Sequence, residues 1–265
     1  MTQEVKSNFQ WKQLTQKNKL NLPKLIGHRG VKNLCPENTI ESITKAFDIG
    51  LSYVEIDVKI SKDEIPILLH DDTFDRTTSG TGLAINLDYE DVRKLDAGEF
   101  FYNKKTDNFI PKLADVLKLC KIRNGNINIE LKPNMGFEKI NVRKIIELTK
   151  EIEDVEIFYS TFDIKSFIEI SNFFMNSNRS FLLDSFDEYS LVDFISISEN
   201  YNANICGLNI ETISKEIIEK IKEKNLLVTV FSENNISLID AKECFNIGVD
   251  SIFIDDPSEL VANYL

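Results

Sequence analysis

The sequence has few of the features that mark thiolate metal sites, secretion or membrane insertion. Its four cysteines are scattered over 265 residues without a CxxC pair, which excludes zinc-ribbon and thioredoxin-like sites and favours reduced, buried thiols. No window approaches ~18 consecutive apolar residues, so no membrane-spanning helix is predicted. The polar, lysine-rich stretch 1–21 lacks an apolar run of signal-peptide length, and we therefore expect a cytoplasmic protein.

Positive charge is also scarce. The chain has 31 lysines and arginines against 43 aspartates and glutamates, which gives a formal net charge of −12. Such a surface repels the phosphates of nucleic acids and of anionic membranes, so neither is an expected partner. A small anionic substrate can still bind where a cation and an arginine are close together.

The length and the apolar pattern favour an α/β fold of one (β/α)8 barrel, a TIM barrel, which typically needs about 250 residues. Short apolar runs alternate with stretches of helical periodicity, such as a helix predicted over 38–49 that Gly50 ends. A doubly wound open sheet is the competing architecture. The predicted parallel strands are 24–28, 53–58, 127–131, 155–159, 180–183, 205–210, 226–231 and 251–254.

A further apolar run, 65–70, follows the second strand too closely to be another parallel strand. A parallel crossover needs about a dozen residues, so this run is predicted to fold back as a hairpin arm. If Ile60 faces Ile65 across the turn, the equal count along both arms places His70 opposite Glu55.

The polar stretch after the hairpin interrupts the alternation of strands and helices. We expect a small insertion over about 71–112, within a single catalytic domain 23–265 that follows an N-terminal extension 1–22.

Both histidines of the chain, His28 and His70, end strand-like apolar runs. The carboxyl ends of barrel strands line the active face, and an imidazole with a pKa of about 6.5 suits proton transfer near neutral pH. A single histidine at a strand end is more often structural, but two such histidines favour catalysis.

Acidic residues repeat at a spacing of two on neighbouring strands. Glu55 and Asp57 face the same way, and two carboxylates inside a barrel need a neutralising partner. A divalent cation, Mg²⁺ or Ca²⁺ with Mn²⁺ as a further candidate, suits oxygen ligands. Glu130 supplies a third ligand from the adjacent strand, and Lys132 shares its face. The alternative for Glu55 and Asp57 is an edge strand with a solvated face, and the alternative for Glu130 and Lys132 is a surface ion pair.

Short motifs occur in order along nearly the whole chain. They are Gly27-His28-Arg29-Gly30, Cys35-Pro36-Glu37-Asn38-Thr39, Val54-Glu55-Ile56-Asp57-Val58, His70-Asp71, Asp75-Arg76-Thr77-Thr78, Glu130-Leu131-Lys132 and Gly248-Val249-Asp250. In this order and at this spacing they resemble the glycerophosphodiester phosphodiesterase family.

The resemblance implies a metal-dependent enzyme that hydrolyses glycerophosphodiesters to glycerol 3-phosphate and an alcohol. It implies Glu55, Asp57 and Glu130 as metal ligands, and His28 and His70 as the general acid–base pair. It also implies a set of residues around the substrate. These are Arg29, Lys132 and Asn38 at the phosphate, Glu37 in support, and Phe231 on the alcohol side.

The sequence departs from the family on the predicted seventh strand. Phe231-Ser232-Glu233-Asn234 stands where the family has Trp-Thr-Val-Asn. The aromatic wall is kept, the indole donor is lost, and Glu233 adds a negative charge, so the alcohol group is expected to differ from the usual one.

Two alternative functions stay open at this point. One is a lysophospholipase D-like or phospholipase C-like activity on lipid phosphodiesters, with an apolar collar from Phe100, Phe101, Tyr102 and Phe109. The other is a barrel that binds a phosphorylated ligand without turnover. The residues do not assign separate roles to the two histidines, the first nucleophile or an oligomeric state.

Overall fold

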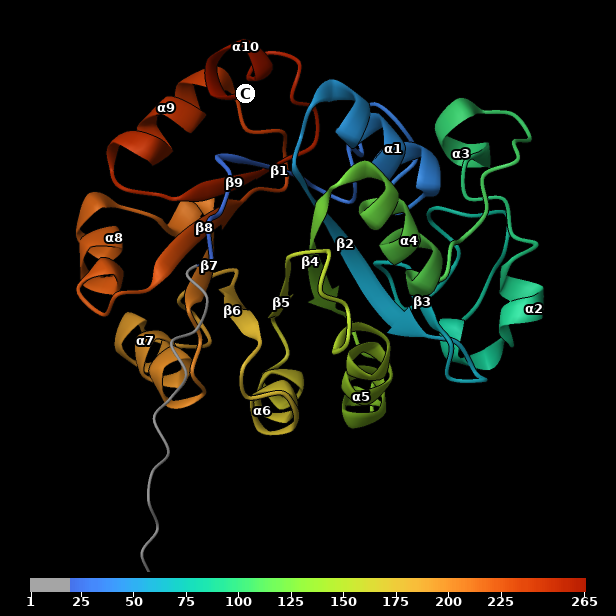
Figure 1. Ribbon diagram of the computed structural model, residues 1–265, viewed down its shortest axis with the longest axis horizontal. Helices are drawn as coiled ribbons and strands as arrows, with labels where there is room; N and C mark the ends of the chain where they lie inside the picture. Colours follow the sequence, from blue (N-terminus) through green and yellow to red (C-terminus); the bar gives the residue numbers. More distant parts are fainter. Residues whose placement is uncertain (1–19) are drawn as a thin grey trace, which may run out of the picture.

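The computed structural model describes residues 20–265, so nearly all of the predicted extension 1–22 lies outside the described residues. Eight parallel strands form a closed barrel, because the first strand pairs with both the last and the second, with Gly27 opposite Val54 (Figure 1). The predicted (β/α)8 barrel is confirmed. The barrel strands are β1 (Leu25–Gly27), β2 (Tyr53–Ile60), β4 (Asn126–Leu131), β5 (Ile157–Thr161), β6 (Asn178–Leu183), β7 (Ile205–Asn209), β8 (Leu227–Phe231) and β9 (Ser251–Ile254).

Helices surround the barrel on the outside (Figure 1). The first of them ends at Gly50, as predicted, in a left-handed conformation, but it begins at Ile40, two residues later than predicted, because the Thr39 side chain caps it. No helix of the described part of the chain is long and apolar enough to cross a membrane. The helices are α1 (Ile40–Ile49), α2 (Tyr89–Val92), α3 (Glu99–Tyr102), α4 (Leu113–Arg123), α5 (Glu138–Thr149), α6 (Ile164–Phe173), α7 (Leu191–Asn200), α8 (Lys215–Lys222), α9 (Leu238–Asn246) and α10 (Val261–Tyr264).

The barrel separates two hydrophobic cores. Side chains such as Val54, Ile56 and Val58 face outward from β2 and pack under the helices. A second cluster, which includes Tyr53 and Phe158, fills the interior. Polar side chains are therefore left to the inner face near the carboxyl ends of the strands.

The hairpin has a different register from the predicted one. The arm β3 (Pro66–Leu68) pairs with β2 so that Ile60 lies opposite Pro66 rather than Ile65. The turn contains one more residue than expected, because Ser61 donates to the Ile65 carbonyl and Glu64 takes a left-handed conformation at φ 59°. The predicted pairing of His70 with Glu55 is therefore wrong.

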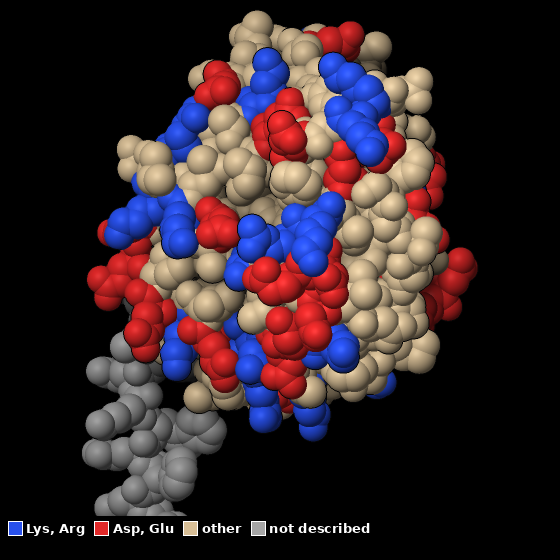
Figure 2. Space-filling view, turned by 90° about the vertical axis from the view of Figure 1, so that its right-hand side faces the viewer, with Lys and Arg blue, Asp and Glu red and all other residues tan. Residues whose placement is uncertain are grey.

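Residues 71–112 form a compact unit beside α1 and α4 (Figure 1). Phe74, Tyr89, Val92 and Ile110 give it a small core of its own, shared with the hairpin arm. Figure 2 looks onto this side of the molecule, where acidic and basic side chains are interspersed next to an uncharged surface.

All four thiols, Cys35, Cys120, Cys206 and Cys244, are free and buried. Burial raises their pKa values, to about 12 for Cys120 and Cys206. We expect the native protein to react only slowly with a disulfide reagent such as DTNB, and all four thiols to react at once in guanidinium, because the thiolate is the nucleophile. Rapid reaction of one protein thiol with DTNB in the native protein would contradict this burial.

Candidate active site

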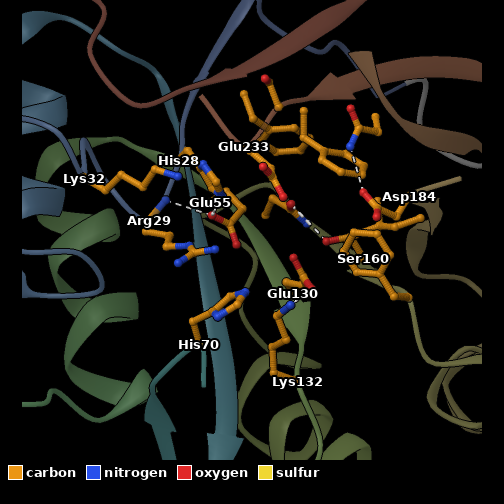
Figure 3. Close-up of a pocket in the computed structure, with 17 residues that line it drawn as sticks. His28, Arg29, Lys32, Glu55, His70, Glu130, Lys132, Ser160, Asp184 and Glu233 are labelled. Atoms are coloured by element: carbon orange, nitrogen blue, oxygen red, sulfur yellow. Dashed lines mark hydrogen bonds and ion pairs between the residues drawn. The ribbon is translucent and has the colours of Figure 1, made fainter. Parts of the chain in front are cut away.

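The polar residues predicted to be functional converge at the carboxyl ends of the barrel strands. Six of them, His28, Arg29, Glu55, His70, Glu130 and Lys132, line a cavity of about 520 Å³, a size typical of small-molecule sites, whereas Asp57 and Asn38 are buried behind its wall. In Figure 3, His28, Glu55, Arg29 and His70 lie on one side of this cavity, whereas Asp184 lies on the other.

Glu55, Asp57 and Glu130 form the carboxylate cluster, in which one oxygen from each lies within 4.8 Å of the others. Neighbouring strands bring them together, since Asp57 on β2 pairs directly with Glu130 on β4. All three are buried, and Oε1 of Glu55 accepts no hydrogen bond from the described residues. Burial, followed by repulsion from the other two carboxylates, raises the pKa of Glu55 well above its usual range. A buried oxygen without a donor in an all-oxygen cluster fits a hard divalent cation.

Asp57 has the opposite electrostatic environment. Its Oδ2 accepts from Asn38 Nδ2 at 2.9 Å and lies 3.2 Å from Arg29 Nε. Burial alone would raise the pKa of Asp57, but the charges of Arg29 and Lys132 outweigh burial and hold it well below its usual range. Asp57 is therefore ionised at neutral pH and available as a ligand.

Both histidines are held by a carboxylate. His28 Nδ1 lies 2.7 Å from Asp255 and His70 Nδ1 lies 2.6 Å from Asp71. Because the carboxylate accepts a hydrogen bond from Nδ1–H, each Nε2 is left as the reactive nitrogen. His28 Nε2 is 4.0 Å from Glu55 Oε2. Burial lowers the pKa of both imidazoles, so both are neutral near pH 7.

Two cations border the carboxylate cluster. Arg29 follows β1 in a left-handed conformation at φ 52°, which the tight turn to Gly30 imposes. Its backbone N–H donates to Glu55, and its guanidinium donates to Glu37 at 2.8 Å. Lys132 Nζ lies 2.8 Å from Glu130 at the end of β4. Both side chains line the cavity, where they can bind an anion.

An aromatic wall lies at the carboxyl end of β8. Phe231 contacts Phe162 edge to face, with ring centroids 5.3 Å apart, and both line the cavity. Glu233 also lines the cavity and is exposed. The aromatic residues proposed for a lipid collar lie elsewhere: none of the residues Phe100, Phe101, Tyr102 and Phe109 is among the described residues lining this cavity.

The sequence analysis assigned no role to several polar residues that the structure adds to the site, although Asp71 and Arg76 stand in its motifs. Asp255, Asp71 and Arg76 pair with predicted site residues, and Asn128 and Ser160 line the cavity. The alternation Asn126, Asn128, Glu130 along β4 was a signal for Asn128, whereas Asp255 lies 227 positions from its partner.

A buried lysine was also missed. Lys59 follows Glu55 and Asp57 at the next position on the inner face of β2, and its side chain is 1% exposed. Its Nζ lies 3.1 Å from Asp72. Burial lowers the pKa of Lys59, an effect that Asp72 only partly offsets.

The chain is similar to known proteins over about nine-tenths of its length. Residues 28–259 match the model of the glycerophosphoryl diester phosphodiesterase family. A glycerophosphodiester phosphodiesterase of Caldanaerobacter subterraneus is 27% identical, over 89% of this chain and 96% of the relative. One of Bacillus altitudinis is 30% identical, over 91% and 97%. A phosphodiesterase of Oleispira antarctica, solved in complex with the product sn-glycerol-3-phosphate, superposes with a TM-score of 0.84 at 26% identity, over 91% of this chain and 96% of that one.

Proposed function

Because this chain belongs to the glycerophosphoryl diester phosphodiesterase family, we propose that it hydrolyses glycerophosphodiesters to glycerol 3-phosphate and an alcohol. The observation that carries the proposal is the meeting of two carboxylate-held histidines with the carboxylate cluster in one cavity. The sn-glycerol-3-phosphate bound by the Oleispira antarctica enzyme supports the same product class.

We propose the carboxylate cluster as the site of one divalent cation, Mg²⁺ or Ca²⁺, with Mn²⁺ as a further candidate. When bound, such a cation supplies Lewis-acid polarisation of a phosphoryl oxygen. Arg29 and Lys132 bind the remaining phosphoryl charge, and Asn38 fixes Asp57 through paired hydrogen bonds of 2.9 and 3.1 Å. Glu37 holds the Arg29 guanidinium in place.

His28 and His70 act as the acid–base pair. In each ring the Nδ1–H donates to a carboxylate, so one Nε2 can take a proton from the attacking oxygen while the other, once protonated, donates to the leaving alkoxide. The attacking oxygen is either water or a glycerol hydroxyl of the substrate. Phe231 and Phe162 form the wall against which the alcohol packs.

The proposed function belongs to a single domain. We propose that 23–265 is one catalytic domain, that 71–112 is an insertion within it, and that 1–22 precedes it as an extension. A cytoplasmic location stays a prediction from the sequence.

A substrate panel tests the function against the lipid alternative. We expect glycerol 3-phosphate release from glycerophosphocholine when Mg²⁺, Ca²⁺ or Mn²⁺ is supplied in turn. The long-chain acyl derivative should react at least about tenfold more slowly in kcat/KM, because none of the aromatic residues considered for a lipid collar is among the described residues that line the cavity. The His28→Ala variant gives the background rate of hydrolysis. Faster hydrolysis of the acyl derivative would favour the lipid activity, and binding without product with every ion would favour a non-catalytic barrel.

A further inference from the structure

A continuous series of ion pairs joins one candidate catalytic histidine to the candidate phosphate-binding arginine. His70 Nδ1 lies 2.6 Å from Asp71, and Arg76 binds Asp71. Arg76 also binds Glu37, which accepts from Arg29. We call these five residues the Arg76 network. It joins the end of the hairpin arm, which holds His70, to the loop between β1 and α1, which holds Arg29.

Arg76 engages both carboxylates with two hydrogen bonds each. Nε and Nη2 donate to the two oxygens of Asp71 at 2.7 and 2.9 Å. Nη1 and Nη2 donate to the two oxygens of Glu37, both at 2.8 Å. Arg76 is 47% exposed, and a single exposed ion pair is generally weak. Two bidentate pairs on one planar group fix geometry as well as charge, which a lysine cannot reproduce.

The insertion does not depend on Arg76 for its attachment to the barrel. Its own core buries Phe74 and Val92. A separate pair of hydrogen bonds joins it to α1, because Tyr102 and Asn108 both donate to the Glu41 carboxylate, at 2.8 and 2.7 Å. The four hydrogen bonds of Arg76 are thus not needed to hold the insertion in place, and they end at Asp71 and Glu37.

We propose that Arg76 is a positioning residue that fixes the His70 imidazole relative to Arg29 through Asp71 and Glu37. This inference rests on the proposed function, since it assumes that His70 transfers a proton and that Arg29 binds the phosphoryl group.

The electrostatics of the network agree with this role. Arg76, chiefly through its hydrogen bonds, lowers the pKa of Asp71 and so keeps it ionised as the acceptor for His70 Nδ1. Burial would raise the pKa of Glu37, but its hydrogen bonds and its charge interactions with Arg76 and Arg29 lower it. Nη2 of Arg76 binds one oxygen of each carboxylate, so removing Arg76 leaves two nearby anions without a shared cation. Asp71 and Glu37 would then separate, and His70 would move with Asp71.

Two substitutions, Arg76→Lys and Arg76→Met, test the proposal in the full chain with metal supplied. We expect kcat on glycerophosphocholine to fall about 10²-fold in both, the loss typical of a catalytic group misplaced by about 1 Å. KM should change by less than about threefold, because Arg29 keeps its ion pair with Asp57 and because Lys132 and the metal site do not contact Arg76. Adding Arg76→Met to Asp71→Asn should lower kcat by much less than Arg76→Met does alone, since the two substitutions share the connection from Arg76 through Asp71 to His70.

Arg93→Met is the matched control, because Arg93 lies in the same insertion and its side chain pairs with the exposed Glu90, away from the cavity. It should leave kcat unchanged. Arg76→Lys retains the charge and the aliphatic stem, so its kcat tests the positioning role even if Arg76→Met unfolds. Wild-type kcat in Arg76→Lys, or a loss confined to KM, would overturn the positioning role. Absence of turnover in the wild type would instead refute the proposed function.

Discussion

The His28→Ala variant should lose turnover of glycerophosphocholine by about 10²–10⁴-fold, the range for removing a general acid or base. His28 is the group best placed for this effect, with Nδ1 on Asp255 and Nε2 4.0 Å from Glu55. It lies at the end of β1 and lines the cavity, so its removal leaves both hydrophobic cores intact. The measurement is kcat from glycerol 3-phosphate release, together with the melting temperature. His70→Ala should give a loss in the same range.

Asp255→Asn provides the matched variant for this experiment. It keeps the volume at Nδ1 but removes the negative charge that orients the ring and stabilises the imidazolium, so an intermediate loss is expected. The double variant His28→Ala with Asp255→Asn should be no slower than His28→Ala alone, because groups that act as a unit are not additive. Full activity of folded His28→Ala would remove His28 from the mechanism.

An α/β fold with parallel strands could be predicted because few topologies satisfy the observed spacing, whereas the choice of a closed barrel over a doubly wound sheet depended on the family resemblance. Eight apolar runs separated by long crossovers leave little besides a parallel sheet, and 65–70 could only return as a hairpin. The two-residue spacing of Glu55 and Asp57 placed both on the inner face, where the structure has them. Sequence periodicity determines the face of a strand reliably, because the side-chain period of a strand is two.

Register and long-range pairing could not be predicted in the same way. The hairpin register depended on one extra residue in the turn, which Glu64 permits by adopting a left-handed conformation. The strand β5 runs from Ile157 to Thr161, two residues later than predicted, because its last positions are polar and the apolar run does not include them. The Arg76 network joins positions 39 residues apart, and alternation along one strand contains no information on such partners.

Metal-free protein should be inactive and less thermally stable, and both properties should return when the ion is restored. The carboxylate cluster places three buried acids within 4.8 Å, and Oε1 of Glu55 has no hydrogen-bond donor among the described residues. A cation that binds only the folded protein stabilises it by about 2.7 kcal/mol at a concentration of 100 times its Kd. The measurements are activity after chelation with EDTA and the melting temperature during titration with Mg²⁺, Ca²⁺ or Mn²⁺. Activity that is indifferent to chelation would rule out the site.

Glu55→Gln separates metal binding from catalysis, because the melting temperature reports on it without substrate. The amide keeps the side-chain volume and removes one charge from a cluster in which burial and repulsion raise the pKa of Glu55. Without metal, this variant should melt at a higher temperature than metal-free wild type at neutral pH, since the folded wild type must either hold a buried charge or bind a proton that the unfolded chain does not, and the amide removes that cost. Added metal should raise the melting temperature of Glu55→Gln only slightly, because one of the three ligands is missing. Glu216→Gln, at an exposed helical site, is the control and should retain the wild-type gain. An equal metal-dependent gain in Glu55→Gln would exclude Glu55 as a ligand.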